Sequence, residues 1–174
     1  GRSYEGDYLN DLKVGDKLES FPPFGPRVWR TPPDGSMIVF VSAGCGNKPI
    51  VNLLREAMKA NLPVAYFHAD TNSTTHALRR YFEATVPEGT PMSYFYSKPL
   101  EHDVNSPNVS TERMTGEKIV SSLKAVGVSL DKVEFYISLR YEGTCKLVKG
   151  LHEAGVSDDR IVPHYFGPIL PTTE

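Results

Sequence analysis

The chain has 174 residues, of which 40% are hydrophobic and 23% charged, a balance typical of one globular domain with a sizeable core. Its formal net charge of −2 at pH 7 argues against a nucleic-acid partner, because such a partner normally requires a basic face. No apolar run approaches the ~20 residues that a membrane-spanning helix needs, so we expect no membrane partner.

The first 36 residues differ in pattern from the rest of the chain. The segment 11–20 is typical of a turn followed by a short strand. The proline-rich stretch 21–29 is typical of a loop that leads into another strand. This part predicts a small N-terminal β segment, residues 1–36, that is too short to close a barrel of its own.

From Met37 onward, short apolar or β-branched runs alternate with helical patterns, which indicates βαβ units and a parallel sheet. Apolar residues at helical spacing form stripes in 50–58, 119–126 and 147–151. The predicted strands are Met37–Ser42, Val64–Ala69, Met92–Ser97, Val133–Ser138 and Arg160–Tyr165.

Two segments between these strands have weaker patterns. Thr74–Glu83 predicts a short polar helix with Asn72 or Ser73 as its N-cap, and Lys98–Thr115 predicts a long surface loop. Right-handed crossovers would place helices on both faces of the sheet. We therefore expect an α/β domain over residues 37–174, with three layers, a doubly wound five-stranded parallel sheet and any ligand at the carboxyl ends of its strands.

The junction Met37–Pro49 joins a predicted strand directly to a glycine turn and a helix start. Glycines let the backbone turn tightly and approach a ligand, while the following helix aims free N–H groups and the positive end of its dipole at that point. The junction therefore predicts a phosphate site. Its candidate residues are Gly44, Cys45, Gly46, Asn47, Lys48 and Pro49.

Several motifs carry a resemblance, in matching order and spacing: Leu12-Lys-Val-Gly-Asp-Lys-Leu, Val41-Ser-Ala-Gly-Cys-Gly-Asn-Lys-Pro, Phe67-His-Ala, Phe135-Tyr-Ile and Phe166-Gly-Pro. Together they resemble the reductase half of flavohemoglobins, in the ferredoxin-reductase-like superfamily. The resemblance implies an NAD(P)-binding domain with sheet order 3-2-1-4-5, preceded by an FAD-binding β-barrel. Residues 1–36 match only the last portion of that barrel.

What that family does is implied for this chain. NAD(P)H would give hydride to FAD, and the flavin would pass electrons to the heme of a globin domain. The sequence contains no globin segment, and it lacks the front of the barrel. The expected partners are therefore a globin or FAD domain, or an unknown protein. In this resemblance Ser138, Leu139 and Arg140 flank the nicotinamide, and Phe166 lies by the flavin. Among the histidines, His68 at the end of a strand is expected to line the cleft, with a structural hydrogen-bonding role as the alternative.

The sequence departs from the family pattern at several of these positions. The family reads Gly-x-Gly-x-Thr-Pro where this chain has Lys48, which either contacts phosphate in place of the hydroxyl or extends into solvent. The family's Cys-Gly-Pro becomes Ser138-Leu139-Arg140, and a leucine in place of glycine is expected to fill part of the pocket. The arginine of His-Ala-x-Arg becomes Thr71.

Two further departures lie at the flavin end, where Gly6 replaces a serine and His164 replaces an acidic residue. Two hypotheses follow from these changes. The chain is an NAD(P)H-dependent flavin oxidoreductase module, weak or inactive alone, or it is a non-catalytic binding protein that reuses the fold, a pseudoenzyme.

The two cysteines, Cys45 and Cys145, do not form a disulfide scaffold, and no cysteine or histidine group has the spacing of a zinc site. We therefore expect no metal and a cytoplasmic location, with secretion as the open alternative. Both cysteines are predicted near the carboxyl edge of the sheet. They are either two unpaired thiols or a disulfide across the cleft.

Overall fold

The computed structural model describes residues 4–20, 22, 29, 32 and 35–166. The strand expected to follow the proline-rich stretch 21–29 lies mostly outside these residues, as do Gly167 and Pro168 of the C-terminal motif.

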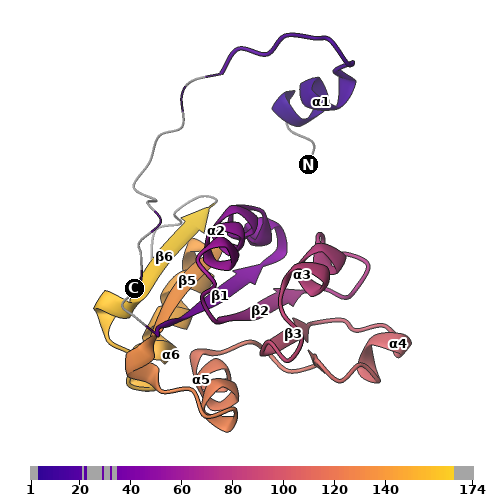
Figure 1. Ribbon diagram of the computed structural model, residues 1–174. Helices are drawn as coiled ribbons and strands as arrows, with labels where there is room; N and C mark the ends of the chain where they lie inside the picture. Colours follow the sequence, from indigo (N-terminus) through magenta and orange to yellow (C-terminus); the bar gives the residue numbers. More distant parts are fainter. Residues whose placement is uncertain (1–3, 21, 23–28, 30–31, 33–34, 167–174) are drawn as a thin grey trace, which may run out of the picture.

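Six parallel strands form one sheet in the described part of the chain, in the order β4-β3-β2-β1-β5-β6 (Figure 1). All five predicted strands are present, as β1, β2, β3, β5 and β6. Counted without β4, they follow the expected order 3-2-1-4-5, which is confirmed. The expected strand count was wrong by one, because β4 has two residues and is too short to show any periodicity. The bounds are β1 Met37–Ala43, β2 Val64–Asp70, β3 Met92–Tyr96, β4 Val109–Ser110, β5 Val133–Arg140 and β6 Ile161–Phe166.

Helices cover both faces of the sheet, as expected for a doubly wound domain (Figure 1). The main helices are α2 Asn47–Lys59, α3 Arg79–Thr85, α5 Gly116–Ala125 and α6 Tyr141–Glu153. Short elements complete the order: α4 Glu101–Val104 and the 3₁₀ turns η1 Gly44–Gly46, η2 Leu130–Lys132 and η3 Asp158–Arg160.

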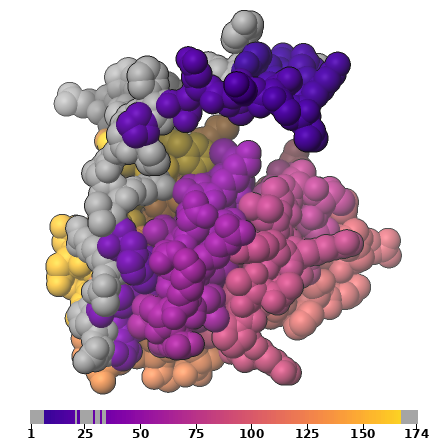
Figure 2. Space-filling model, turned by 45° about the horizontal axis from the view of Figure 1, so that its top comes forward, coloured from indigo at the N-terminus to yellow at the C-terminus, as the bar shows by residue number. Residues whose placement is uncertain are grey.

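The core consists of two apolar clusters, one on each side of the sheet. Successive strand residues point to opposite faces, so Ile38 and Phe40 of β1 pack under α2 and α3, while Val39 and Val41 pack under α5 and α6. Figure 2 shows the outer surfaces of α2, in purple, and α3, in pink, side by side. The three-layer architecture is therefore confirmed.

The N-terminal part differs from the expectation. Residues Tyr4–Asp11 form a helix, α1, and residues 12–20 contain a turn at Val14-Gly15 and no strand. The apolar side chains of Val14 and Leu18 are exposed, and a strand without a partner strand or an apolar surface is not stable. The division of the chain after residue 36 stays a prediction.

The helix expected over Thr74–Glu83 begins later, at Arg79, and its N-cap is Leu78 rather than Asn72 or Ser73. Side-chain hydrogen bonds explain the delay, because Asn72 Oδ1 accepts from the backbone N–H of Thr74, 3.1 Å away, and holds a turn instead of a helix. Leu78 itself adopts φ +62°, which is uncommon for a residue other than glycine.

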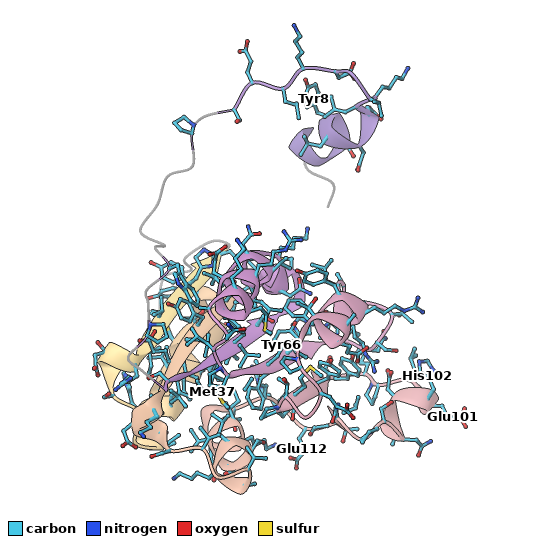
Figure 3. All side chains as sticks on the ribbon, in the orientation of Figure 1. Tyr8, Met37, Tyr66, Glu101, His102 and Glu112 are labelled. Carbon is cyan, nitrogen blue, oxygen red and sulfur yellow. The ribbon has the colours of Figure 1, made fainter. Side chains whose placement is uncertain are left out.

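The expected loop Lys98–Thr115 contains both α4 and β4. The buried carboxylate of Asp103 organises this segment: its Oδ2 accepts from the backbone N–H groups of Leu100 at 2.9 Å and Ser73 at 3.2 Å. Glu101 and His102 project outward from α4, far from the labelled Tyr66 in the sheet (Figure 3). Within the described residues, no helix combines the length and the apolar character that crossing a membrane requires.

Candidate functional site

The glycine turn packs directly against the neighbouring strands. Gly44 has φ +51°, in the left-handed region that favours glycine. At Gly46, a Cβ atom would lie 2.0 Å from the carbonyl oxygen of Ser138 and 3.1 Å from Cε1 of Phe166. The turn therefore fits against β5 and β6 only because residue 46 has no side chain.

Beside this turn, at the carboxyl edge of the sheet, lies an open cleft of about 1150 Å³. The ends of β1, β2, β5 and β6, the first turn of α5 and one side of α6 along most of its length line it. From β1 the sheet grows to one side through β2 and β3, and the next long strand, β5, is added on the other side of β1. The carboxyl edge between β1 and β5 is thus a topological switch point, where open α/β sheets bind ligands. Five of the predicted site residues line the cleft: Gly44, Cys45, Leu139, Arg140 and Phe166.

Four other predicted residues are buried beneath the cleft rather than lining it. Gly46, His68 and Ser138 are buried in the turn and the strands. The side-chain amide of Asn47 is buried too, and its Nδ2 donates to the carbonyl oxygen of Ala77. These residues support the cleft from inside the protein, because their polar atoms point into the protein and not into the cleft.

Lys48 and Pro49 lie in the first turn of α2 and do not line the cleft. Lys48 is exposed, and that turn contains no acidic residue. Its contact with phosphate stays a prediction, and this geometry favours the solvent-exposed alternative.

Leu139 is almost completely buried and belongs to the core cluster under α5 and α6. Its side chain lies against the first turn of α6, since a Cβ on Gly143 would be 3.5 Å from Leu139 Cδ2. The leucine therefore occupies space on the floor of the cleft beside Arg140, the exposed N-cap residue of α6.

The cleft carries both paired and unpaired cations. Lys146 is 2.5 Å from Glu142, and Lys149 is 3.8 Å from Glu153. Arg113 and Arg140 have no ion pair within the described ranges. Sequence reasoning missed Arg113, because it lies in the segment expected to be a surface loop, and only the crossover from β4 to α5 brings it to this edge.

A buried polar chain runs from β1 to the end of β2. The Oγ of Ser42 is 2.7 Å from Nδ1 of His68, and Nε2 of His68 is 3.3 Å from Oδ2 of Asp70, which lines the cleft. Partial burial opposes ionisation of Asp70, but hydrogen bonds from His68, Thr75 and the Thr71 backbone outweigh it and lower the pKa of Asp70 to about 2.

His76 stacks on His68 with 3.9 Å between ring centroids, and its Nδ1 is 3.0 Å from Oη of Tyr96. Burial lowers the pKa of His76 to about 3, and repulsion from His68 acts in the same direction. Burial also lowers the pKa of His68, against the attraction of Asp70. Both imidazoles are therefore neutral at neutral pH. No sequence signal indicated this stack, because the two residues come from different elements.

The depressed pKa of His76 predicts acid-sensitive stability. Above the unfolded value of about 6.5, both states hold His76 neutral. Below it, the unfolded chain takes up a proton that the folded chain excludes down to about pH 3. We therefore expect this group to lower the free energy of unfolding by about 2 kcal/mol between pH 6.5 and 5. Urea unfolding at pH 7 and 5 measures the effect.

Two variants test the assignment. His76→Phe is expected to reduce this pH dependence, whereas His102→Gln, which changes an exposed histidine, is expected to retain it. An unchanged pH dependence in His76→Phe would show that other groups carry it.

Cys45 and Cys145 are both exposed and free. Cys45 lines the cleft and Cys145 belongs to α6. No group of three or more histidine, cysteine or acidic residues in the described part of the chain is arranged to hold a metal ion.

Comparison with known proteins gives a consistent set of relatives. The chain is 30% identical over 180 residues to a flavohemoprotein of Rhizobium meliloti (strain 1021), covering 96% of the chain and 41% of the relative. It is 27% identical over 168 residues to a flavohemoprotein of Bacillus anthracis, covering 93% and 40%. The chain thus spans about 40% of the length of these curated relatives. No protein-family model matches it.

Solved structures show the same relationship. The flavohem-like FAD/NAD binding domain of nitric oxide dioxygenase from Vibrio cholerae O1 biovar El Tor superposes with a TM-score of 0.74 at 25% identity, covering 94% of the chain and 64% of that domain. The cytochrome b5 reductase domain of Ulva prolifera nitrate reductase superposes with a TM-score of 0.72 at 13% identity, covering 91% and 63%. The second likeness shows the fold alone.

Proposed function

The chain is a homologue of the reductase module of flavohemoproteins, and on that premise we propose that it binds a nicotinamide dinucleotide in the cleft at the carboxyl edge of its sheet. The observation that carries the proposal is the cleft itself, which lies beside the glycine turn and at the switch point between β1 and β5. Its volume of about 1150 Å³ is ample for a ligand of this size.

The charges of the cleft suit the pyrophosphate of such a ligand. Arg113 and Arg140 line the cleft without an ion pair in the described residues, so their guanidinium groups are available to an anion. The glycine turn adds backbone N–H groups at the start of α2. Phe166, which lies against Gly46 of that turn, supplies an apolar wall of the cleft.

Hydride transfer requires FAD, which would accept the hydride when bound beside the nicotinamide. The described residues before β1 form a helix and a turn and offer no barrel strand to hold a flavin. We therefore propose that flavin chemistry depends on an FAD domain, in the same protein or a partner, and that a globin domain is the electron acceptor, as the name flavohemoprotein suggests for the relatives. Residues 37–174 would then be the nucleotide-binding unit.

A non-catalytic binding role is the alternative. The observation that favours it is Leu139, which is buried on the cleft floor, where the related sequences that this chain resembles have a glycine. If Leu139 fills the end of the cleft where the nicotinamide would bind, the adenosine half of a dinucleotide could still bind, but no hydride would be transferred.

Titration calorimetry with NADH, NADPH and FAD separates these functions, combined with a visible spectrum of the purified chain. Micromolar binding of a nicotinamide nucleotide is expected. Binding that is millimolar or absent for both nucleotides would refute the proposal and leave a scaffold role. Anaerobic mixing of NADH, the chain and a separately purified FAD-loaded flavin domain of a flavohemoprotein then distinguishes the two binding roles. Only a chain that delivers hydride speeds the loss of flavin absorbance above the rate seen with that flavin domain and NADH alone.

A further inference from the structure

A second pocket, of about 630 Å³, lies on the other face of the sheet from the cleft. The loop after β2, the helix α3 and the short helix α4 each contribute side chains to its lining. One of these, His76, contacts the rings of Tyr66 and Tyr94, which belong to the core cluster under α2 and α3. The cleft, in contrast, is lined by α5 and α6, and the two sites share no lining residue.

We propose that this second pocket binds a small oxyanion, either a phosphate or a carboxylate group, through a hydrogen bond from His76 and the charge of Arg80. The inference goes beyond the proposed function, since it concerns a different ligand on a different face of the sheet. A buried nitrogen atom, an arginine and a residue with strained backbone carry it, and all three belong to the lining of this pocket.

His76 supplies the buried donor of the site. The residue is only 4% exposed, yet it lines the pocket. Its Nδ1 is 3.0 Å from Oη of Tyr96. Its Nε2 is buried and has no hydrogen-bond partner among the described residues. A buried polar atom without a partner is rare in native proteins, so this nitrogen points to a group that binds here.

The Tyr96 hydroxyl determines which nitrogen of His76 carries the proton. Burial raises the pKa of Tyr96 to about 12, so the hydroxyl keeps its proton at neutral pH. The guanidinium of Arg79, which can only donate, also forms a hydrogen bond with Oη. Oη therefore accepts from Arg79 and donates to Nδ1 of His76. The single proton of the neutral imidazole is then on Nε2, which needs an acceptor.

Arg80 supplies the positive charge. It is exposed, it lines the pocket, and it forms no ion pair with any residue that the structure describes. Its neighbour Arg79, in contrast, is 2.8 Å from Glu83, so those two charges offset each other. A free guanidinium near a buried N–H donor suits an oxyanion, because both groups donate hydrogen bonds and one is charged.

The strained residue is Leu78, which has φ +62° and is 42% exposed. Its segment is held by a hydrogen bond from the Asn47 side chain to the Ala77 carbonyl and by one from Phe82 N to the Leu78 carbonyl, at 3.1 Å. Conformations of this kind cost energy and recur at ligand clamps and switch regions. Because Nε2 of His76 is buried, a ligand oxygen reaches it only when this segment shifts. The exposed leucine also offers an apolar contact to an organic anion.

The first test titrates the unaltered 174-residue chain with inorganic phosphate and, separately, with acetate, while the ionic strength is held constant with chloride. Long-range ¹H–¹⁵N spectra of the histidine rings report the result. We expect the Nε2–H form of His76 before addition, and a saturable shift of that signal with a Kd of about 1 mM or below for at least one anion. Phosphate and acetate thereby distinguish the two ligand classes.

His152 on α6 is the control histidine, because it is exposed and lies outside the pocket. Its signals are expected to stay unchanged. Equal shifts of His76 and His152 would indicate a general salt effect and overturn the inference. A proton on Nδ1 of His76, or no saturable shift with either anion, would overturn it as well.

The second test is Arg80→Gln, an exchange on the surface of α3 that is expected to weaken binding of the anion at least about tenfold. Lys124→Gln removes the same charge from an exposed position at the end of α5 and is expected to leave the affinity unchanged. Equal effects of the two exchanges would contradict the inference. His76→Phe, which keeps an aromatic ring, is expected to abolish binding. If that variant does not fold, Arg80→Gln and the imidazole signals still decide between the outcomes.

Discussion

Replacing Gly46 with alanine is expected to lower the free energy of unfolding by about 3 kcal/mol or more, the upper end of the usual range for an overpacked core. The added Cβ would lie 2.0 Å from the carbonyl oxygen of Ser138 and 2.9 Å from its carbonyl carbon. Both are backbone atoms of a central strand, so they cannot move aside as a flexible side chain can. The turn and β5 would have to separate.

Urea unfolding, followed by far-UV circular dichroism and by Trp29 fluorescence, measures this loss. Trp29 is a suitable probe because it stacks on Tyr136 of β5, with ring centroids 5.8 Å apart. The matched control is Gly143→Ala in α6, whose new Cβ would meet Leu139 only at ordinary contact distances of 3.5 and 3.6 Å. That variant is expected to be neutral or slightly more stable. Similar unfolding curves for the two variants would contradict the close approach at Gly46.

A double exchange of Arg113 and Arg140 for glutamate is expected to weaken NADH binding at least about a hundredfold. Each arginine would lose a hydrogen bond to a charged group, worth about 1.5–3 kcal/mol, and each ~1.4 kcal/mol is a factor of ten in affinity. The new carboxylates would also repel the pyrophosphate. Calorimetric titration at two salt concentrations measures both effects, because removing charge contacts also reduces the salt dependence of binding.

The control for this prediction changes two other cations of the same cleft. Lys146→Glu with Lys149→Glu alters the net charge by the same amount, but both lysines already have carboxylate partners, Glu142 and Glu153. A much smaller loss of affinity is therefore expected. An equal loss of NADH affinity in the lysine and the arginine variants would contradict the prediction. It would show that the ligand responds to the overall charge of the cleft and not to the two unpaired guanidinium groups.

The sheet and its main helices were predictable because their signals are strong and local. β1, with five consecutive fully buried residues, appears in the sequence as an uninterrupted apolar run. The stripes of α2 and α6 point to one face at helical spacing. The N-terminal β segment was expected from a turn-and-strand pattern over residues 11–20, but such a local pattern is not sufficient where the described residues offer no neighbouring strand.

The candidate site was predictable only in part, because its geometry depends on contacts between distant elements. The glycine turn was visible as a motif, and Leu139 and Arg140 were placed beside it through the resemblance. Asp70 could be assigned no partner from sequence, since its environment depends on His68 and on a loop that bends back at Thr75. Lys48 was a natural candidate by sequence position, yet the helix carries it away from the cleft lining.

The two outer strands of the sheet bear on how copies of this chain behave at high concentration. β4 has only two residues, so it offers few backbone groups to an added strand. β6, at the other end of the sheet, contains Pro163, which has no N–H to donate. Short strands and prolines at sheet edges discourage strand addition between molecules. In the order β4-β3-β2-β1-β5-β6, the two strands least able to pair with a strand of another molecule thus lie at the two edges of the sheet.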